Sequence, residues 1–491
     1  MFSAPGDGYS RFPQACFAGI KKTDKETDKE DELRKRMKKT GDSLIEEDRK
    51  PGYNPDDWGV CIKGNGGKEG MLERCDFRQA RDLMMEHVGP VGMQKAPLSA
   101  CAGRILARTV TAQEDVPPFD RSPYDGYAFR AKDVEAASLQ DPVTLRIVDY
   151  IAAGDVPHTG ITAGTAAHLM TGAPVPEGAD AVLPFEKTRF TDEEVTISSP
   201  VKPGSNVVRA GEDIRKGMTL CGAGVRIDAG LAGTLAGQGI FEPYVYKKPL
   251  VGVISTGSEI LEEGETPAPG RIYNSNRYAL QTACELAGCR SIYIGTVIDE
   301  TDTIAQAIAS ALKTCDAVIL SGGVSVGDFD CTPAAMEKAG VEILAHGLAL
   351  KPGMAGAYGI FDDRKSDPSG GQGDGAIPVF GLSGNPAACM TAFYAVVLPV
   401  LRKMMGFAPE DCIPAKLRVR LSGDYSRKNQ SARLLRGKVD LTAVVQEMQP
   451  AAGQGNQMLS TLAGSNAFAE IPAGTTVQAG ETVDAFLMGD I

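Results

Sequence analysis

Residues 316–330, Asp-Ala-Val-Ile-Leu-Ser-Gly-Gly-Val-Ser-Val-Gly-Asp-Phe-Asp, constrain the fold of this chain more than any other stretch. The apolar run at 317–320 is short enough to be a buried strand, and it leads into a Ser-Gly-Gly loop that carries almost no side chain. A helical pattern begins near Thr332. A strand, a glycine loop and a helix in this order present backbone N–H groups to an anion at the carboxyl end of the strand.

The same loop continues with acidic residues, which a plain phosphate cradle does not need. Asp328 and Asp330 close the stretch. A carboxylate pair beside a phosphate loop makes sense when a divalent cation sits between them. A tight turn whose aspartate caps the next helix explains this loop equally well when it is taken alone.

Two more predicted strands end in the same way. The apolar runs at 250–254 and 377–382 each lead into a Ser/Gly loop, and the second precedes a long helix. Such loops gather at one edge of an open parallel sheet, so together they predict a nucleotide- or phosphate-bearing ligand with a metal. The residues predicted to bind it are Ser255, Gly257, Gly322, Gly323, Ser325, Gly327, Asp328, Ser383, Gly384, Asn385 and Pro386.

Charged residues stand at two further strand ends. The predicted strand at 292–298 runs into Asp299, and an apolar run runs into Lys351-Pro352-Gly353. A lysine at such a turn is a natural partner for a phosphate or another oxyanion, although a surface lysine can also be merely solvated.

Composition excludes several classes of protein. The net charge of −12 argues against non-specific nucleic-acid binding. The chain contains no run of about 18 apolar residues, so we expect no membrane span. The first ten residues lack the apolar core of a signal peptide, and the 11 cysteines form no C-x-x-C pair. We therefore expect a cytoplasmic protein with reduced thiols. The four histidines lie in unrelated contexts, which argues against a zinc site.

The pattern along the 491 residues divides the chain into segments. Residues 1–75 form a charged, glycine-containing extension to which we assign no role. Strand and turn patterns fill 121–204, strands and helices alternate over 247–408, and 409–491 is β-rich, as in a small barrel. Within the last segment, residues 416–421 alternate between apolar and basic side chains.

Several motifs, in one order, resemble the molybdopterin molybdenumtransferases, the family of the MoeA proteins and the gephyrin E domain. The resemblance runs from about Asp76 to the C-terminus. Its most specific parts are Ser-Pro-Tyr-Asp-Gly-Tyr-Ala at 122–128, the rigid loop at 171–182, the glycine loop at 321–327 and Lys351-Pro352-Gly353.

The resemblance implies a multidomain fold of α/β and β units. It contains an elongated linking domain (76–120 and 205–246), an inserted β domain (121–204), an α/β domain of the molybdopterin-binding type with a parallel-rich sheet (247–408), and a C-terminal β-barrel (409–491). It also implies a homodimer, with each site between the α/β domain of one subunit and the inserted domain of the other. Molybdopterin adenylyltransferase, which shares the α/β domain, is a further expected partner.

The implied reaction places molybdate on the dithiolene of adenylylated molybdopterin and releases AMP in the presence of Mg²⁺. Asp299 and Asp330 are the expected Mg²⁺ ligands. The expected catalytic residues are Asp125, Glu259, Asp330 and Lys351. Thr171 and Asp213 match residues that line the site, and Arg436, Ser460 and Asn466 match barrel residues that contact molybdate or the pterin.

Two positions depart from the family pattern. Gly347 stands where a basic residue usually precedes the Lys-Pro-Gly lysine by four positions, and Met354-Ala355 replaces Lys-Pro. These losses leave open a non-catalytic scaffold that binds the pterin. A second alternative is a molybdopterin adenylyltransferase, which needs neither the inserted domain nor the barrel.

Overall fold

A computed structural model describes residues 71–324, 331–362 and 375–489 of the chain. The predictions for Ser325, Gly327, Asp328 and Asp330, and those for residues 1–70, fall outside the described residues. The chain forms two compact units. In the described part, the first unit contains Thr109–Gly222 and Gly233–Phe241, and the second contains all other residues.

The first unit is built on a six-stranded sheet in which β5 and β6 run parallel and the other neighbours antiparallel. Successive residues of β4 enter different apolar clusters, Tyr127 and Phe129 in one and Ala128 in the other, so both faces of the strand are buried. In sheet order the strands are β7 (Ala181–Pro184), β4 (Gly126–Phe129), β6 (Thr165–Leu169), β5 (Val143–Ile151), β9 (Glu194–Ile197) and β8 (Arg189–Phe190).

Strand β4 begins at Gly126. A Cβ atom at Gly126 would collide with the main chain of β7, where Leu183 C lies 2.9 Å from its position. Glycine is therefore required here because two strands approach closely, and not because of a left-handed turn.

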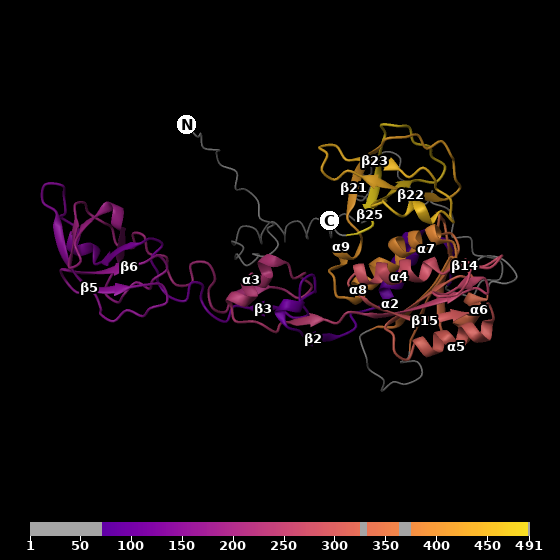
Figure 1. Ribbon diagram of the computed structural model, residues 1–491, viewed down its shortest axis with the longest axis horizontal. Coiled ribbons are helices and arrows are strands. Elements are labelled where there is room, and N and C mark those ends of the chain that lie inside the picture. The colour runs from indigo at the N-terminus through magenta and orange to yellow at the C-terminus, as the bar shows by residue number, and fades with distance from the viewer. Residues whose placement is uncertain (1–70, 325–330, 363–374, 490–491) are drawn as a thin grey trace, which may run out of the picture. The chain divides into compact units, whose positions relative to one another are not determined.

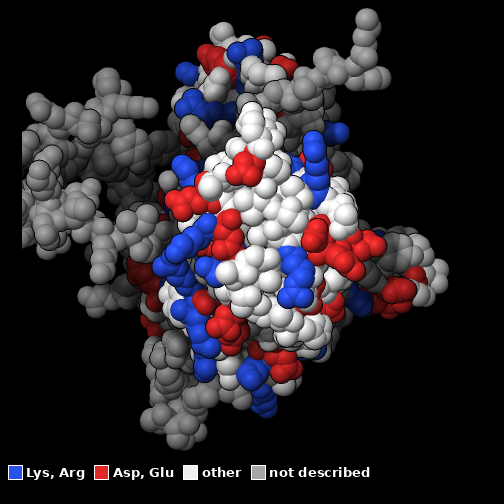
Figure 2. Space-filling view, turned by 90° about the vertical axis from the view of Figure 1, so that its left-hand side faces the viewer, with Lys and Arg blue, Asp and Glu red and all other residues white. Residues whose placement is uncertain are grey.

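Figure 2 shows one side of the described surface. Basic and acidic side chains are interspersed with uncharged surface on this side. Nucleic-acid backbones are held by clustered positive charge, and the side in view presents both signs in close alternation.

The second unit contains a seven-stranded sheet, and it confirms the parallel-rich sheet predicted for the α/β segment. Only β19 runs antiparallel to its neighbours. In sheet order the strands are β1 (Leu72–Cys75), β17 (Glu342–Leu348), β19 (Gly356–Phe361), β20 (Ile377–Leu382), β16 (Ala317–Ser321), β12 (Leu250–Thr256) and β15 (Arg290–Val297). Strand β1 lies in residues that we expected to belong to the N-terminal extension, yet it pairs in parallel with β17.

Helices cover both faces of this sheet (Figure 1). Val253 of β12 packs into one apolar cluster and its neighbour Ile254 into the other, as the period of two in a strand requires. The helices on the first face are α2 (Phe77–His87), α4 (Ser275–Leu286), α7 (Pro386–Ala392), the π-helical turn η7 (Phe393–Val397) and α8 (Leu398–Met404), and those on the second are α5 (Thr301–Ala311) and α6 (Thr332–Lys338). Helix α2 thus packs on the α/β sheet, although we expected its residues in the linking domain.

The segments α7, η7 and α8 form one helical stretch, Pro386–Met404, that is long and apolar enough to cross a membrane. It is 89% buried inside the protein over its most apolar window. Because its side chains fill the core between sheet and barrel elements, it is explained as a core helix.

The C-terminal residues form the predicted barrel. Its five strands close through the pairing of β22 with β24, and β18 (Leu350–Lys351) adds to the edge of β22. The expected alternation in β21 is confirmed, since Val419 and Leu421 are buried while Arg418 faces Asp484 of the neighbouring strand at 3.0 Å. The barrel strands are β21 (Lys416–Leu421), β22 (Ala432–Val439), β23 (Glu447–Pro450), β24 (Ala467–Ile471) and β25 (Thr482–Leu487), preceded by α9 (Pro409–Cys412).

The two segments expected in the linking domain pair with each other at two places. In the second unit β2 (Met93–Lys95) pairs with β11 (Tyr244–Tyr246), and in the first unit β3 (Val110–Thr111) pairs with β10 (Thr219–Cys221). Helix α3 (Ala229–Gly237) follows β10 in the chain.

Candidate functional site

The carboxyl ends of β12, β16 and β20 lie side by side, because these strands are parallel neighbours. Gly322 N donates to Leu382 O at 3.0 Å. Asn276 Nδ2, from the first turn of α4, donates to Ser321 Oγ at 2.6 Å and to Gly384 O at 2.9 Å. The structure therefore brings two of the predicted glycine loops together, and Asn276 links them.

The glycines of the β16 loop are required by close packing. Gly322 has a φ of +117°, and a Cβ there would lie 2.5 Å from Thr256 O at the end of β12. Gly323 has a φ of +61°, and its Cβ would lie 2.7 Å from Thr332 Oγ1. Any larger residue would push the loop off the strand ends, so close packing requires glycine at both positions.

Two of the predicted acidic residues, Glu259 and Asp299, each lie next to a glycine of these loops. A Cβ at Gly257 would lie 2.9 Å from the carboxylate carbon of Glu259, so this carboxylate folds back over the β12 loop. Asp299 Oδ1, at the end of β15, lies 3.7 Å from the Cβ position of Gly323. The predicted residue Ser255 is buried and hydrogen-bonded to the amide of Asn274, so it serves the internal network.

Two buried polar atoms at this edge lack a partner among the described residues. They are Thr256 Oγ1 and Asn276 Oδ1. A buried polar atom without a hydrogen bond costs about 1–3 kcal/mol. The sequence does not predict either residue as part of the site, since a threonine or asparagine after a strand looks like an ordinary cap or turn residue.

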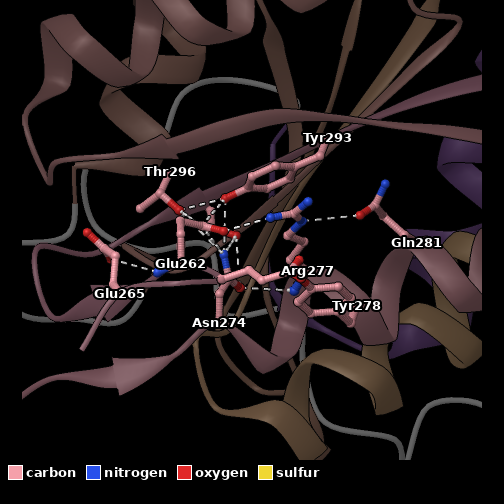
Figure 3. Close-up of polar contacts among 10 residues, drawn as sticks. Glu262, Glu265, Asn274, Arg277, Tyr278, Gln281, Tyr293 and Thr296 are labelled. Carbon is pink, nitrogen blue, oxygen red and sulfur yellow. Dashed lines mark hydrogen bonds and ion pairs between the residues drawn. The ribbon is translucent and has the colours of Figure 1, made fainter. Parts of the chain in front are cut away.

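A network around Glu262 holds the chain that follows the β12 loop (Figure 3). Asn274 Nδ2 and Tyr293 OH donate to Glu262 Oε1 at 2.9 and 2.7 Å, and Arg277 Nη1 donates to Oε2 at 2.7 Å. Thr296 Oγ1 is a further donor. Burial opposes the charge, but these hydrogen bonds outweigh it and lower the pKa of Glu262 to about 2.

Cationic residues gather where the barrel meets the α/β sheet. Lys351 of β18 is exposed and lies in register with Arg433 of β22. Arg436 is fully buried, and burial together with the charge of Arg433 lowers its pKa to about 10. Among the described residues, Arg436 Nη1 and Arg433 Nε have no hydrogen-bond partner. A buried, incompletely paired guanidinium pair favours a bound anion.

One barrel segment joins these cations to the glycine loops. Arg436 Nη2 donates to Gly455 O at 3.2 Å, and the next residue, Asn456, accepts from Ala387 N at 3.0 Å through its carbonyl. Ala387 follows the predicted loop residues Ser383, Gly384, Asn385 and Pro386. The predicted phosphate loop and the cation cluster are thus neighbours within one unit.

The other two predicted barrel residues have different surroundings. Ser460 is exposed in the short helix η8 (Leu459–Thr461), beside the Arg436 partner Thr461. Asn466 uses both ends of its amide on the main chain of Val439, at 2.8 and 3.0 Å. Their expected contacts with molybdate or the pterin stay predictions.

The remaining predicted site residues lie in the first unit. Thr171 donates to Asp125 Oδ1 from its backbone N at 2.6 Å and from Oγ1 at 2.8 Å. The backbone bond and then the hydroxyl bond lower the pKa of Asp125, so it is a carboxylate at neutral pH. Asp213 is exposed, and its backbone N donates to Val116 O.

The described residues include one of the two predicted Mg²⁺ ligands, Asp299. In the described ranges, no group of three or more His, Cys, Asp or Glu residues could hold a metal ion. Mg²⁺ needs only one or two carboxylates together with waters and substrate phosphates. Asp299 beside the Gly323 loop fits such a site, and its expected partner Asp330 lies outside the described residues.

A parallel-rich sheet with glycine loops at its carboxyl edge, joined to a cation-bearing barrel, defines a class of proteins that bind a phosphate-bearing ligand and a further anion. Three protein-family models match in chain order. They are the MoeA N-terminal region (domain I and II) at residues 75–239, a probable molybdopterin-binding domain at 252–403, and the MoeA C-terminal region (domain IV) at 418–488.

Curated relatives match over most of their length. The molybdopterin molybdenumtransferase of Bacillus subtilis is 35% identical over 392 residues, which is 78% of this chain and 87% of the relative. That of Staphylococcus epidermidis is 34% identical over 406 residues, 82% of this chain and 93% of the relative. A crystal structure of the molybdopterin biosynthesis MoeA protein from Pyrococcus horikosii superposes with a TM-score of 0.73 at 31% identity, covering 85% of this chain and 99% of that one. This chain belongs to the molybdopterin molybdenumtransferase (MoeA) family.

Proposed function

We propose that this protein is a molybdopterin molybdotransferase of molybdenum cofactor biosynthesis. It inserts molybdate into adenylylated molybdopterin and releases AMP in a Mg²⁺-dependent step. The observation that carries the proposal is the connection from the buried Arg436 through Gly455 and Asn456 to Ala387, the residue that follows the glycine loop at Ser383–Pro386. A site that joins a phosphate loop to an oxyanion pocket suits a reaction between a nucleotide-bearing pterin and an oxyanion.

The glycine loops receive the pyrophosphate of the adenylylated substrate. The N–H groups of Gly323 and Gly384 act as donors at the strand ends, whereas those of Gly322 and Gly257 already donate to Leu382 O and Val297 O and hold the loops in place. Glu259 and Asp299 flank this position. Asp299 and Asp330 would hold Mg²⁺, and the ion would supply charge neutralisation on the phosphoanhydride oxygens.

The barrel side receives molybdate. Lys351 reaches it from the exposed end of β18, while Arg436 contributes positive charge from within the barrel. Ser460 lies in η8, next to Thr461, which accepts a hydrogen bond from Arg436. The positive groups hold the oxyanion next to the phosphoanhydride, so both reactants are oriented before the transfer.

Asp125, Thr171 and Asp213 complete the site from the first unit of a second subunit, so the protein acts as a homodimer. Asp125 is ionised at neutral pH, which makes it an acceptor that orients a donor or a hydrated cation. This arrangement is in keeping with a cytoplasmic enzyme that receives its substrate from a molybdopterin adenylyltransferase.

AMP release tests the proposal. Purified protein receives adenylylated molybdopterin, Mg²⁺ and increasing molybdate, beside Asp330→Ala and the control Asp302→Ala, whose carboxylate pairs with Lys338 on the surface. We expect molybdate-dependent AMP release that falls by at least about a hundredfold in Asp330→Ala and stays normal in the control. If the protein binds the substrate but releases no AMP at any molybdate level, the insertase assignment fails and a pterin-binding scaffold explains the fold better.

A further inference from the structure

Arg74 adopts an unusual backbone conformation at the edge of the α/β sheet. Its φ of +46° lies in the left-handed region, which non-glycine residues seldom occupy. Glu73 and Cys75 pair with His346 and Leu348 of β17, so Arg74 lies opposite Gly347, whose φ of +75° is also left-handed. Backbone strain of this kind clusters at ligand-binding sites.

The side chain of Arg74 covers Gly347. Its Cγ lies 3.5 Å from the position that a Cβ of Gly347 would take. Arg74 Nη2 lies 3.5 Å from Met354 Sδ, a weak acceptor. The residue is exposed, and no carboxylate pairs with its guanidinium in the part of the chain that the structure describes. Toward the described residues, its guanidinium therefore makes one weak contact and has donors to offer a ligand.

Lys351 lies in a short loop, residues 348–354, that runs beside the strand of Arg74. Leu348 N donates to Met354 O at 2.8 Å and closes this loop, and Ala349 N donates to Cys75 O at 2.7 Å. The loop carries Lys351, whose register partner is Arg433. The loop with Lys351 is thus joined to β22 through Arg433 and to β1 through Cys75, the residue next to Arg74.

We propose that Arg74 binds the molybdate oxyanion together with Lys351, and this inference rests on the proposed function. A planar guanidinium donates two parallel N–H groups to two oxygens of a tetrahedral oxyanion. The loss of a basic residue at position 347 is then offset by Arg74, whose Cγ lies 3.5 Å from the position of a Cβ at 347.

Equilibrium binding of molybdate, measured by titration calorimetry on the full chain, tests this inference. We compare the unaltered protein with Arg74→Ala, Arg74→Lys and the double variant Arg74→Ala/Gly347→Lys. The control is Arg290→Ala, an exposed arginine at the amino end of β15 in the same sheet. Thermal unfolding of each variant checks that the fold is retained.

We expect Arg74→Ala to raise the Kd for molybdate about tenfold. Arg74→Lys should recover part of the affinity, and the double variant should recover most of it, because its lysine starts beside the vacated space. An unchanged Kd in Arg74→Ala, or an equal rise in Arg290→Ala, would overturn the inference. Normal molybdate binding without AMP release would reject the proposed function alone, whereas no molybdate binding by the unaltered protein would reject both.

Discussion

At the scale of single residues, the glycines of the strand-end loops decide whether these loops can pack at the carboxyl ends of β12, β16 and β20. A methyl group on Gly322 would lie 2.5 Å from Thr256 O, and the φ of +117° adds strain. Gly322→Ala should therefore lower the free energy of unfolding by about 2–4 kcal/mol and abolish molybdate-dependent AMP release. Urea unfolding and the AMP assay measure both effects.

Gly264 offers a matched control for Gly322. Its φ of +89° is also left-handed, but a Cβ there would meet nothing within 4 Å. Gly264→Ala should cost only the backbone strain, about 1 kcal/mol, and leave AMP release intact. Equal losses in the two variants would contradict the close-packing explanation.

At the scale of secondary-structure elements, hydrogen bonds to Glu262 connect the loop after β12 to β15 and to Asn274, the N-cap of α4 (Figure 3). Its pKa of about 2 in the folded state lies below the ordinary value of 4.5. The network therefore stabilises the fold above pH 4.5, by about 2–3 kcal/mol, and this contribution is lost as the pH falls from 4.5 towards 2.

Glu262→Gln tests this contribution. The variant should unfold more easily than the unaltered protein at pH 7, by about 2 kcal/mol, and the difference should narrow between pH 4.5 and pH 3. Urea unfolding at several pH values measures it. Glu263→Gln is the control, since this neighbouring carboxylate is exposed and accepts one bond from Tyr278 OH. A pH-independent difference would show that the effect of Glu262 does not depend on its charge.

At the scale of the whole molecule, the predicted site needs residues from both units. Light scattering should give twice the chain mass of 51.7 kDa. If each site takes Asp125 from one subunit and Lys351 from the other, co-expressed Asp125→Ala and Lys351→Ala chains should recover about a quarter of normal AMP release, because half of the dimers are mixed and each has one intact site. A mixture as inactive as the single variants would place both residues in one subunit.

Much of the architecture could be predicted from the sequence. The predicted strands that end before Gly257, Gly322 and Gly384, the helix after Gly384, the alternation in β21 and the barrel are confirmed. The loop at Gly257 instead leads into the short strand Ile260–Leu261 before any helix. These features depend on neighbours in the chain, where apolar periodicity and glycine carry strong local signals. Strand β1 was missed because its four residues, Leu-Glu-Arg-Cys, show no alternation.

By itself, the sequence determined the glycine loops at the strand ends, the β-rich C-terminal segment and the family. Only the tertiary structure decided the contacts that shape the site: Asn276 between two loops, the Glu262 network, the buried Arg436 and the position of Arg74 over Gly347. Each of these contacts joins strands or loops whose adjacency follows from sheet order and register. Local propensity does not encode that order, because burial and hydrogen bonding across distant segments decide it.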